Sequence, residues 1–257
     1  MIVGFIGSGN MAAAMARGWS SSGHDAPAKM LFTDSGSGRA TALAKEVDGE
    51  AIANNADLVK ASDFVVLAMK PSGLEAVAES LPTPRAILSL LGATKVSQLT
   101  ELFPDSTVIR LMPNLAVETG RGVIAVAEPE NSDRQIIDEA LTLLGSLGSV
   151  VELDDTQMDA ATAVMGCSPA YFAVVADALA KAGARDGLDP VVSIHMVAES
   201  LAGTAELLKR RTPFEIQVAV ASPGGSTEAG LEALKEARGS EAFEAAAAAS
   251  LARMRGN

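Results

Sequence analysis

The chain opens with a short apolar run, IVGFI (residues 2–6), which leads directly into the motif GSGNMA (7–12). Gly7, Gly9 and Ala12 match the spacing G-x-G-x-x-G/A, placed here after an expected strand and at the start of an expected helix. In that context the first glycine allows a tight turn, the second lets the backbone approach a pyrophosphate, and the small third residue lets helix and strand pack closely. The residues expected to face a dinucleotide at this helix start are Gly7, Ser8, Gly9, Asn10 and Met11.

Short apolar segments continue at intervals through the first 153 residues, with helical segments between most of them. The expected strands are 2–6, 30–34, 64–71, 86–92, 107–114, 122–128 and 149–153. Such alternation is typical of a doubly wound parallel sheet with helices on both faces. The sequence therefore predicts an α/β fold with an N-terminal Rossmann-type dinucleotide-binding domain over 1–153.

From residue 154 onward the pattern changes, because no segment reads as a strand. Ala-rich helical segments are expected at 156–182, 190–211, 214–221, 226–237 and 241–254, separated by Gly, Pro and Asp. The sequence therefore predicts an all-helical C-terminal domain over 154–257.

The composition argues against several classes of partner. The chain has 257 residues and a formal net charge of −12, whereas nucleic acids and anionic membranes attract clustered Lys and Arg. No stretch reaches 18 consecutive apolar residues, so no membrane span is expected. The first strand begins at the N-terminus, with no basic segment and long apolar run ahead of it. We therefore expect a soluble cytoplasmic protein.

Metal and thiol chemistry are not expected. The two histidines, His24 and His195, lie far apart and lack the spacing of metal ligands. Cys167 is the single cysteine, so no intrachain disulfide exists, and no neighbouring motif supplies a histidine to activate its thiol.

The residues after the second strand bear on the choice of cofactor. An acidic residue such as Asp34 accepts hydrogen bonds from ribose hydroxyls and favours NAD. Ser35, Ser37 and Arg39 would instead hold a 2′-phosphate, which Asp34 would repel unless it points away. Two hydroxyls and an arginine on a glycine-containing loop favour the phosphate. We therefore expect NADPH, with NADH as the alternative.

The third and fifth strands of the chain also end in segments that suggest a site. Ligands of open α/β sheets bind at the carboxyl ends of the strands, where these two strands carry AMKP and MPN. Either segment alone could be ordinary strand termination, but two at one sheet edge favour a site. The residues expected there are Ala68, Met69, Lys70, Pro71, Pro113 and Asn114.

The stretch VASPGGSTEAG (220–230) interrupts a tract rich in Ala, Leu and Glu. Two glycines and a proline stop a helix, and the Ser, Gly and Thr that follow can begin another whose first N–H groups are unpaired. Such a helix start can hold a small anion. The alternative is a turn between two helices with a Ser/Thr cap.

Taken in order and at similar spacing, several segments of the chain resemble pyrroline-5-carboxylate reductases. The segments are GFIGSGNMA, VLAMKP, IRLMPN, ETGRGV, MDAATAVMGCSPAY and SPGGSTEAGLEAL. The resemblance implies a dinucleotide-binding domain followed by a helical domain that intertwines with a second copy, giving a homodimer or a larger homo-oligomer built from dimers. It also implies hydride transfer from NAD(P)H to the C=N carbon of a cyclic imine carboxylate, which gives L-proline.

The resemblance assigns roles to individual residues. It implies that Gly224, Gly225, Ser226 and Thr227 present backbone N–H groups to the substrate carboxylate, with help from Ser222. It places the Thr227 hydroxyl near the ring nitrogen, as an orienting hydrogen-bond partner, and Asn55 near the adenosine end of the cofactor.

The chain departs from the family pattern close to the expected substrate site. Met165 stands where the family usually has a small hydroxyl residue, Ser168 where it has glycine, and Leu115 and Ala116 follow the MPN segment. A bulky Met165 in the substrate pocket would reshape it. Two alternatives therefore stay open: a related reductase of another cyclic imine, and a non-catalytic dinucleotide-binding protein.

Overall fold

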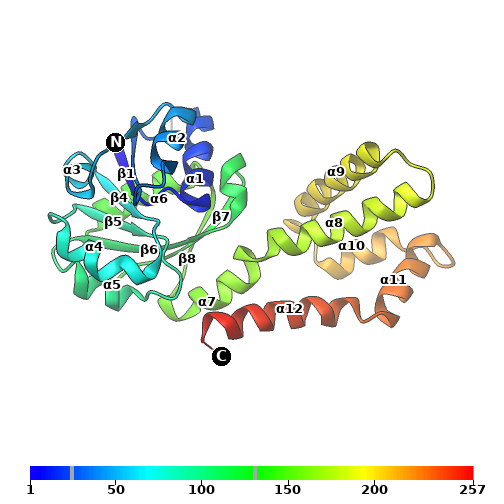
Figure 1. Cartoon of the computed structure of the whole chain (residues 1–257). Coiled ribbons are helices and arrows are strands. Elements are labelled where there is room, and N and C mark those ends of the chain that lie inside the picture. Colours follow the sequence, from blue (N-terminus) through cyan, green and yellow to red (C-terminus); the bar gives the residue numbers. More distant parts are fainter. Residues whose placement is uncertain (24–25, 130–131, 257) are drawn as a thin grey trace. The chain divides into compact units, whose positions relative to one another are not determined.

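The computed structural model describes residues 1–23, 26–129 and 132–256 (Figure 1). His24 lies outside them. Contacts divide the chain into two compact units, one formed by Met1–Cys167 with Leu251–Asn257 and the other by Ser168–Ser250. They are called here the nucleotide unit and the helical unit. The domain boundary at 153/154 stays a prediction.

The nucleotide unit is built on one eight-stranded sheet. Its strands are β1 (Ile2–Ile6), β2 (Lys29–Thr33), β3 (Glu50–Ala51), β4 (Phe64–Leu67), β5 (Ala86–Ser89), β6 (Thr107–Pro113), β7 (Gly122–Ala127) and β8 (Gly148–Glu152). Their order in the sheet is β3-β2-β1-β4-β5-β6-β7-β8. Each strand expected from the sequence is present, and the two-residue β3 was not expected.

The observed sheet departs from the expected doubly wound parallel sheet at one pair of strands. β7 runs antiparallel to β6, with Pro113 opposite Ile124, whereas the other neighbouring pairs are parallel. Only a short 3₁₀ turn (Leu115–Thr119) connects the two strands. A parallel pair needs a crossover of about a dozen residues or more, so this short connection dictates the reversal.

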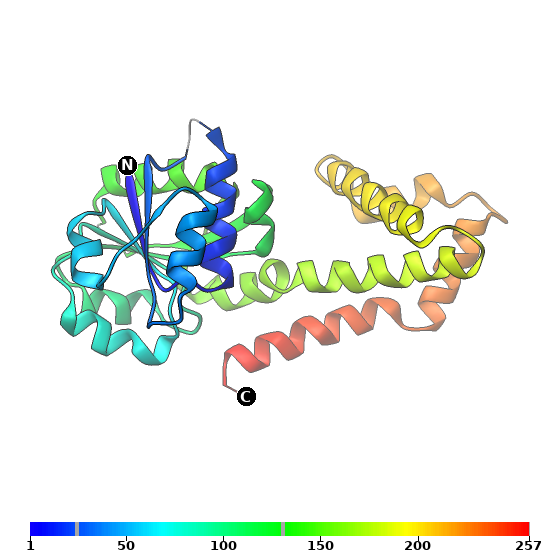
Figure 2. The ribbon, with the colours of Figure 1, turned by 45° about the horizontal axis from the view of Figure 1, so that its top comes forward.

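Helices cover both faces of the sheet (Figure 2). One face packs against α1 (Asn10–Ser21), α2 (Arg39–Glu46) and α6 (Arg134–Gly145). The other packs against α3 (Asn55–Lys60), α4 (Leu74–Ser80) and α5 (Val96–Leu102). A sheet buried on both faces explains why its strands read as continuous apolar runs.

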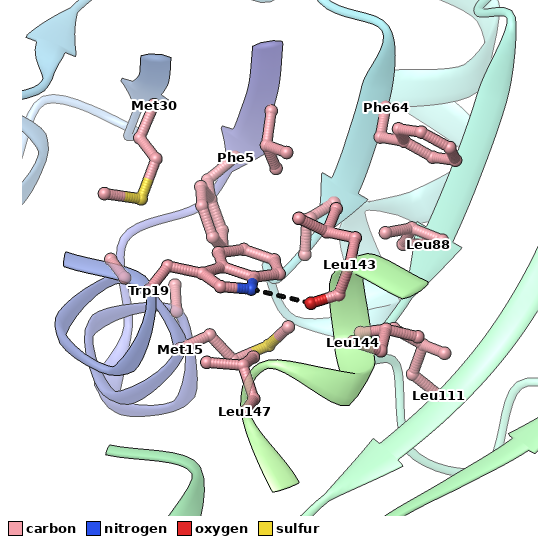
Figure 3. Packing of buried hydrophobic residues seen from close by; sticks show 14 of the residues in the cluster. Phe5, Met15, Trp19, Met30, Phe64, Leu88, Leu111, Leu143, Leu144 and Leu147 are labelled. Atoms are coloured by element: carbon pink, nitrogen blue, oxygen red, sulfur yellow. Dashed lines mark hydrogen bonds between the residues drawn. The ribbon is translucent and has the colours of Figure 1, made fainter. Parts of the chain in front are cut away.

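Trp19 anchors the largest of the buried hydrophobic clusters (Figure 3). Its side chain is fully buried, and its indole N–H donates a hydrogen bond of 3.1 Å to the carbonyl of Leu143 in α6. The centroid of the Phe5 ring lies 5.8 Å from that of the indole, and Phe5 stacks on Phe32 with a centroid distance of 5.2 Å. This aromatic cluster joins α1, α6 and the first two strands.

The segment before the helical unit is less regular than expected. The sequence predicted one helix over 156–182, but a 3₁₀ turn (Asp155–Gln157) leads into α7 (Met158–Ala161) and then a π-helical segment (Thr162–Gly166). Isolated π-helical turns inside helices are rare and frequently lie at functional sites.

Side-chain hydrogen bonds join neighbouring helices of the helical unit. It contains α8 (Ser168–Arg185), α9 (Pro190–Leu208), α10 (Pro213–Val220), α11 (Ser226–Glu236) and most of α12 (Gly239–Met254). Ser193 in α9 donates a hydrogen bond of 2.9 Å to the carbonyl of Ala180 in α8. The Tyr171 hydroxyl of α8 lies 2.6 Å from the Ser250 hydroxyl of α12, and the two helices run side by side there.

Most of the apolar surface of this unit is exposed. Among its described residues only Ala180 and Ser193 are buried. The exposed apolar side chains include Phe172, Val174, Leu179, Val191, Met196, Phe214, Val218, Val220 and Leu234. Two helical stretches, Asp155–Arg185 and Pro190–Leu208, are long and apolar enough for a membrane span although none was expected, and only 6% of each window is buried.

Candidate functional site

A cavity of about 620 Å³ lies at the carboxyl ends of β1, β2 and β4. Its lining includes expected cofactor residues, namely Gly7, Ser8, Gly9, Asp34, Ser35, Arg39, Asn55, Ala68, Met69 and Lys70. The expected residues Asn10, Met11, Pro71, Pro113 and Asn114 are not among those that line it. The strand ends thus gather most of the expected residues at one place.

The glycine motif shapes the floor of this cavity. Gly7 has a φ of +100°, and a Cβ added there would lie 2.7 Å from the carbonyl carbon of Ala68, so only glycine fits. Gly9 precedes α1, and the nearest atom to an added Cβ would be the Ala68 carbonyl oxygen at 3.9 Å. The space before the helix start is therefore open to a ligand, and the unpaired N–H groups of that helix turn favour an anion there.

Asp34 is held inside its own loop. Its carboxylate accepts hydrogen bonds from the N–H of Gly36 (2.7 Å), the N–H and hydroxyl of Ser37 (3.0 and 3.1 Å) and the N–H of Ala40 (2.7 Å). These hydrogen bonds, that from Ala40 foremost, hold the pKa of Asp34 below its ordinary value. Both carboxylate oxygens are therefore engaged by the protein, and the loop presents Ser35, Ser37 and Arg39 to the cavity.

Thr33 fixes Asn55 at the same edge. The Thr33 hydroxyl is buried and donates a hydrogen bond of 2.7 Å to the side-chain oxygen of Asn55, the first residue of α3. Thr33 was not among the expected site residues, although its position at the carboxyl end of the second strand was a signal.

The end of β4 supplies the other wall of the cavity. Ala68, Met69 and Lys70 line it, followed by Ser72 and Gly73 of a 3₁₀ turn and Val77 of α4. The last three were not expected to contribute, because they follow Pro71, with which the expected strand ends. Lys70 is exposed and places a cation at the mouth of the cavity.

Asn114 and Met165 meet at a different place in the nucleotide unit. The Asn114 side-chain N–H₂ donates a hydrogen bond of 3.2 Å to the Met165 carbonyl. Met165 lies in the π-helical segment, and its half-buried side chain packs against a cluster that includes Val96 and Met158. Its side chain is therefore supported by the core of the unit.

The SPGGST loop lies in the helical unit, where α11 begins at Ser226. Gly224 has a φ of +74° and donates its N–H to the Glu228 carboxylate at 2.7 Å, while the Gly225 N–H bonds to the Ser222 carbonyl at 2.9 Å. The expected anion-binding N–H groups of the two glycines are thus engaged in this structure. Ser226 and Thr227 belong to the first turn of the helix, where N–H groups have no intrahelical acceptor.

The described residues contain no group of three or more His, Cys, Asp or Glu arranged to hold a metal ion. His195 is an exposed residue of α9.

Family models match both halves of the chain. The model for pyrroline-5-carboxylate reductase dimerisation matches residues 155–256. The model for coenzyme F420-dependent NADP oxidoreductases matches residues 2–91. A pyrroline-5-carboxylate reductase of Thermus thermophilus is 35% identical over 253 residues, covering 97% of this chain and 96% of the relative.

Solved structures show the same architecture along the full length. A 1-pyrroline-5-carboxylate reductase from Streptococcus pyogenes superposes with a TM-score of 0.89 at 26% identity, covering 100% of this chain and 99% of that one. The pyrroline carboxylate reductase of Plasmodium falciparum, solved with NADP bound, gives a TM-score of 0.87 at 22% identity, covering 100% and 97%. The combination of an N-terminal Rossmann-type domain and a helical C-terminal domain is therefore confirmed.

Proposed function

This chain belongs to the pyrroline-5-carboxylate reductase family, and we propose that it reduces 1-pyrroline-5-carboxylate to L-proline with NADPH, NADH being the alternative cofactor. The observation that carries the proposal is the cavity in which the Gly7–Gly9 turn, the Asp34 loop and the end of β4 come together. A dinucleotide cavity of this kind suits hydride transfer. The SPGGST helix start on the same chain suits a substrate that carries a carboxylate.

The loop after β2 supports NADPH over NADH. Both carboxylate oxygens of Asp34 accept hydrogen bonds from its own loop. Few acceptor positions therefore remain for ribose hydroxyls. Ser35, Ser37 and Arg39 are exposed on the cavity side. The Ser35 hydroxyl and the Arg39 guanidinium offer hydrogen-bond donors that suit a 2′-phosphate, whereas the Ser37 hydroxyl donates to Asp34.

Ser222, Ser226 and Thr227 are proposed to bind the substrate, while Gly224 and Gly225, whose N–H groups are engaged in this structure, shape the turn that precedes α11. The first turn of α11 offers backbone N–H groups and the positive end of the helix dipole to the imine carboxylate. The Thr227 hydroxyl would orient the ring nitrogen by a hydrogen bond. Bound NADPH supplies the hydride for the C=N carbon. A protonated imine is already electrophilic, so orientation of the ring can supply most of the rate without a strong side-chain acid.

A second copy of the chain is the proposed partner of the helical unit. The dimerisation model covers this unit, and its exposed apolar side chains need a cover. An interface between two copies accounts for the apolar character of both long helical stretches without a membrane. We therefore propose a homodimer, or a larger assembly of dimers, in the cytoplasm.

The test is oxidation of NADPH and NADH by the purified protein in the presence of pyrroline-5-carboxylate, with proline identified as the product. Thr227→Ala is expected to lower kcat by about tenfold or more because the ring loses its orienting hydrogen bond. Turnover by Met165→Ser but not by the wild type would favour the related reductase of another imine. NADPH binding without turnover of any cyclic imine would favour a non-catalytic protein.

A further inference from the structure

Asn114 is a buried polar residue whose side-chain oxygen and side-chain nitrogen both form hydrogen bonds. It follows β6 directly and is only 7% exposed. Its side-chain oxygen accepts the Val123 N–H of β7 at 3.1 Å, while its side-chain N–H₂ donates to the Met165 carbonyl at 3.2 Å. The backbone N–H of Asn114 also bonds to the Val123 carbonyl at 3.1 Å. One side chain therefore joins the ends of two strands to the π-helical segment.

The chemistry of that segment explains why a side-chain donor is useful there. In an α-helix the Met165 carbonyl would accept the N–H of residue 169, but residue 169 is proline and has no N–H. The register is already shifted at this point, since the Cys167 N–H bonds to the Thr162 carbonyl five residues back. Asn114 supplies the Met165 carbonyl with a donor from outside the helix.

The location makes this hydrogen bond relevant to the reaction. Met165 stands in the segment expected to face the substrate, and Asn114 stands at the carboxyl end of β6, the edge of the sheet where ligands bind. Asn114 does not line the dinucleotide cavity, and its polar atoms are engaged by the protein. Its position therefore suits support of a substrate-binding segment better than direct contact with the cofactor.

We propose that Asn114 is a positioning residue, which holds the substrate-side segment Met165–Cys167 in register against the carboxyl end of β6. The inference rests on the proposed function for the identity of the substrate. The hydrogen-bond bridge itself can be tested without any substrate.

The test compares Asn114→Asp with a matched Asn55→Asp variant. Asn114→Asp keeps its size and the acceptor for the Val123 N–H, but replaces the donor to Met165 with a carboxylate oxygen that faces a carbonyl. Three quantities are measured for each variant: amide hydrogen exchange over 162–168, the Kd for NADPH, and kcat/KM for the imine. Asn114→Ser, smaller and uncharged, serves as a second variant should the Asp variant fail to fold.

For Asn114→Asp we expect about tenfold faster exchange over 162–168 and about tenfold lower kcat/KM for the imine, with an essentially unchanged Kd for NADPH. Asn55→Asp, at the cofactor cavity, should instead raise the Kd for NADPH and leave that exchange unaltered. The inference is overturned if Asn114→Asp leaves exchange unchanged or weakens NADPH binding as much as it slows the imine. It is also overturned if neither Asn114 variant folds, which would make the residue purely structural. An altered exchange in a protein that reduces no pyrroline-5-carboxylate would reject the proposed function alone.

Discussion

The nucleotide unit and the helical unit differ in how far they bury their apolar side chains. In the nucleotide unit, side chains such as Trp19, Phe5 and Phe32 are fully buried between sheet and helices. In the helical unit, Phe172 and Phe214 are 58% and 71% exposed, and its described residues include only two that are buried. The first unit has a core of its own, whereas the second has apolar surface that a single chain leaves open to water.

The difference teaches where each unit's stability comes from. Helices without a buried face are marginal in water, because their stability in proteins comes mainly from tertiary packing. The helical unit therefore needs an external surface, which we propose to be that of a second copy. Its stability then depends on protein concentration, while that of the nucleotide unit does not.

The largest expected effect is on the self-contained core. Trp19→Ala removes a fully buried indole and its hydrogen bond to the Leu143 carbonyl. We expect it to lower the free energy of unfolding of the nucleotide unit by about 3–5 kcal/mol. Chemical denaturation of the two variants, with unfolding of the nucleotide unit monitored through the loss of NADPH binding, measures this change. Phe172→Ala is the control. If both variants were equally costly in a dilute monomer, the contrast between the two units would fail.

A charge on the open surface should act on association. Phe214→Glu places a carboxylate on the most exposed aromatic side chain of the helical unit. If a second copy covers this position, the change is expected to weaken association by about 2–4 kcal/mol, with NADPH binding retained. Sedimentation velocity together with an NADPH titration measures both quantities. Association of wild-type strength would show that Phe214 lies outside the interface.

The cofactor specificity of the nucleotide unit can be tested on its loop. Arg39 is exposed and lines the cavity beside Ser35 and Ser37. Arg39→Ala is expected to raise the KM for NADPH by about 10- to 100-fold through loss of a charged hydrogen bond to the 2′-phosphate. The KM for NADH should not change. Equal effects on the two cofactors would place Arg39 elsewhere than at the 2′-phosphate.

Asp34 gives a sharper test, because its two alternative roles predict opposite changes in kcat/KM for NADPH. If Asp34 holds its loop in shape, Asp34→Ala should lower kcat/KM for NADPH by about three- to tenfold. A carboxylate that bound the ribose hydroxyls and repelled a 2′-phosphate would give a rise in kcat/KM for NADPH instead.

Since the folded pKa of Asp34 is lowered, its stabilising contribution is present above its unfolded pKa of about 4 and is lost as pH falls through the folded value. NADPH preference should therefore be constant across neutral pH.

The smallest effect should come from a polar contact inside the helical unit. Tyr171→Phe removes the hydroxyl that lies 2.6 Å from Ser250 and 3.3 Å from the Ala246 carbonyl. We expect a loss of about 1 kcal/mol in the stability of the assembled protein. Thermal unfolding at fixed protein concentration measures it, with Ser193→Ala, which loses the bond from α9 to α8, as the comparison. A loss of several kcal/mol would mean that internal contacts, and not a partner, hold this unit together.

Much of the fold was predictable because it follows local patterns. Apolar runs and the GSGNMA turn marked the strands, the first helix and the change to helices near residue 154. The two-residue β3 was missed because it is too short to show a pattern. The reversal of β7 was missed because the length of the connecting turn was not weighed.

The site was predictable as a location more than as a set of contacts. The sequence marked the strand ends that line the cavity, but the engagement of Asp34 depends on how its loop folds back toward Ala40. The hydrogen bond from Asn114 to Met165 joins residues far apart in the chain across a π-helical turn. No local propensity encodes such a contact.

The most direct test of the contrast between the two units is the mass of the wild-type chain in dilute solution, measured by sedimentation equilibrium while far-ultraviolet circular dichroism follows its helix content. We predict a particle of two chains, or a multiple of two, that loses helix content when dilution separates the copies. A folded single chain that keeps its full helix content at the lowest concentration would contradict the account, because the helical unit would then be stable without a second copy.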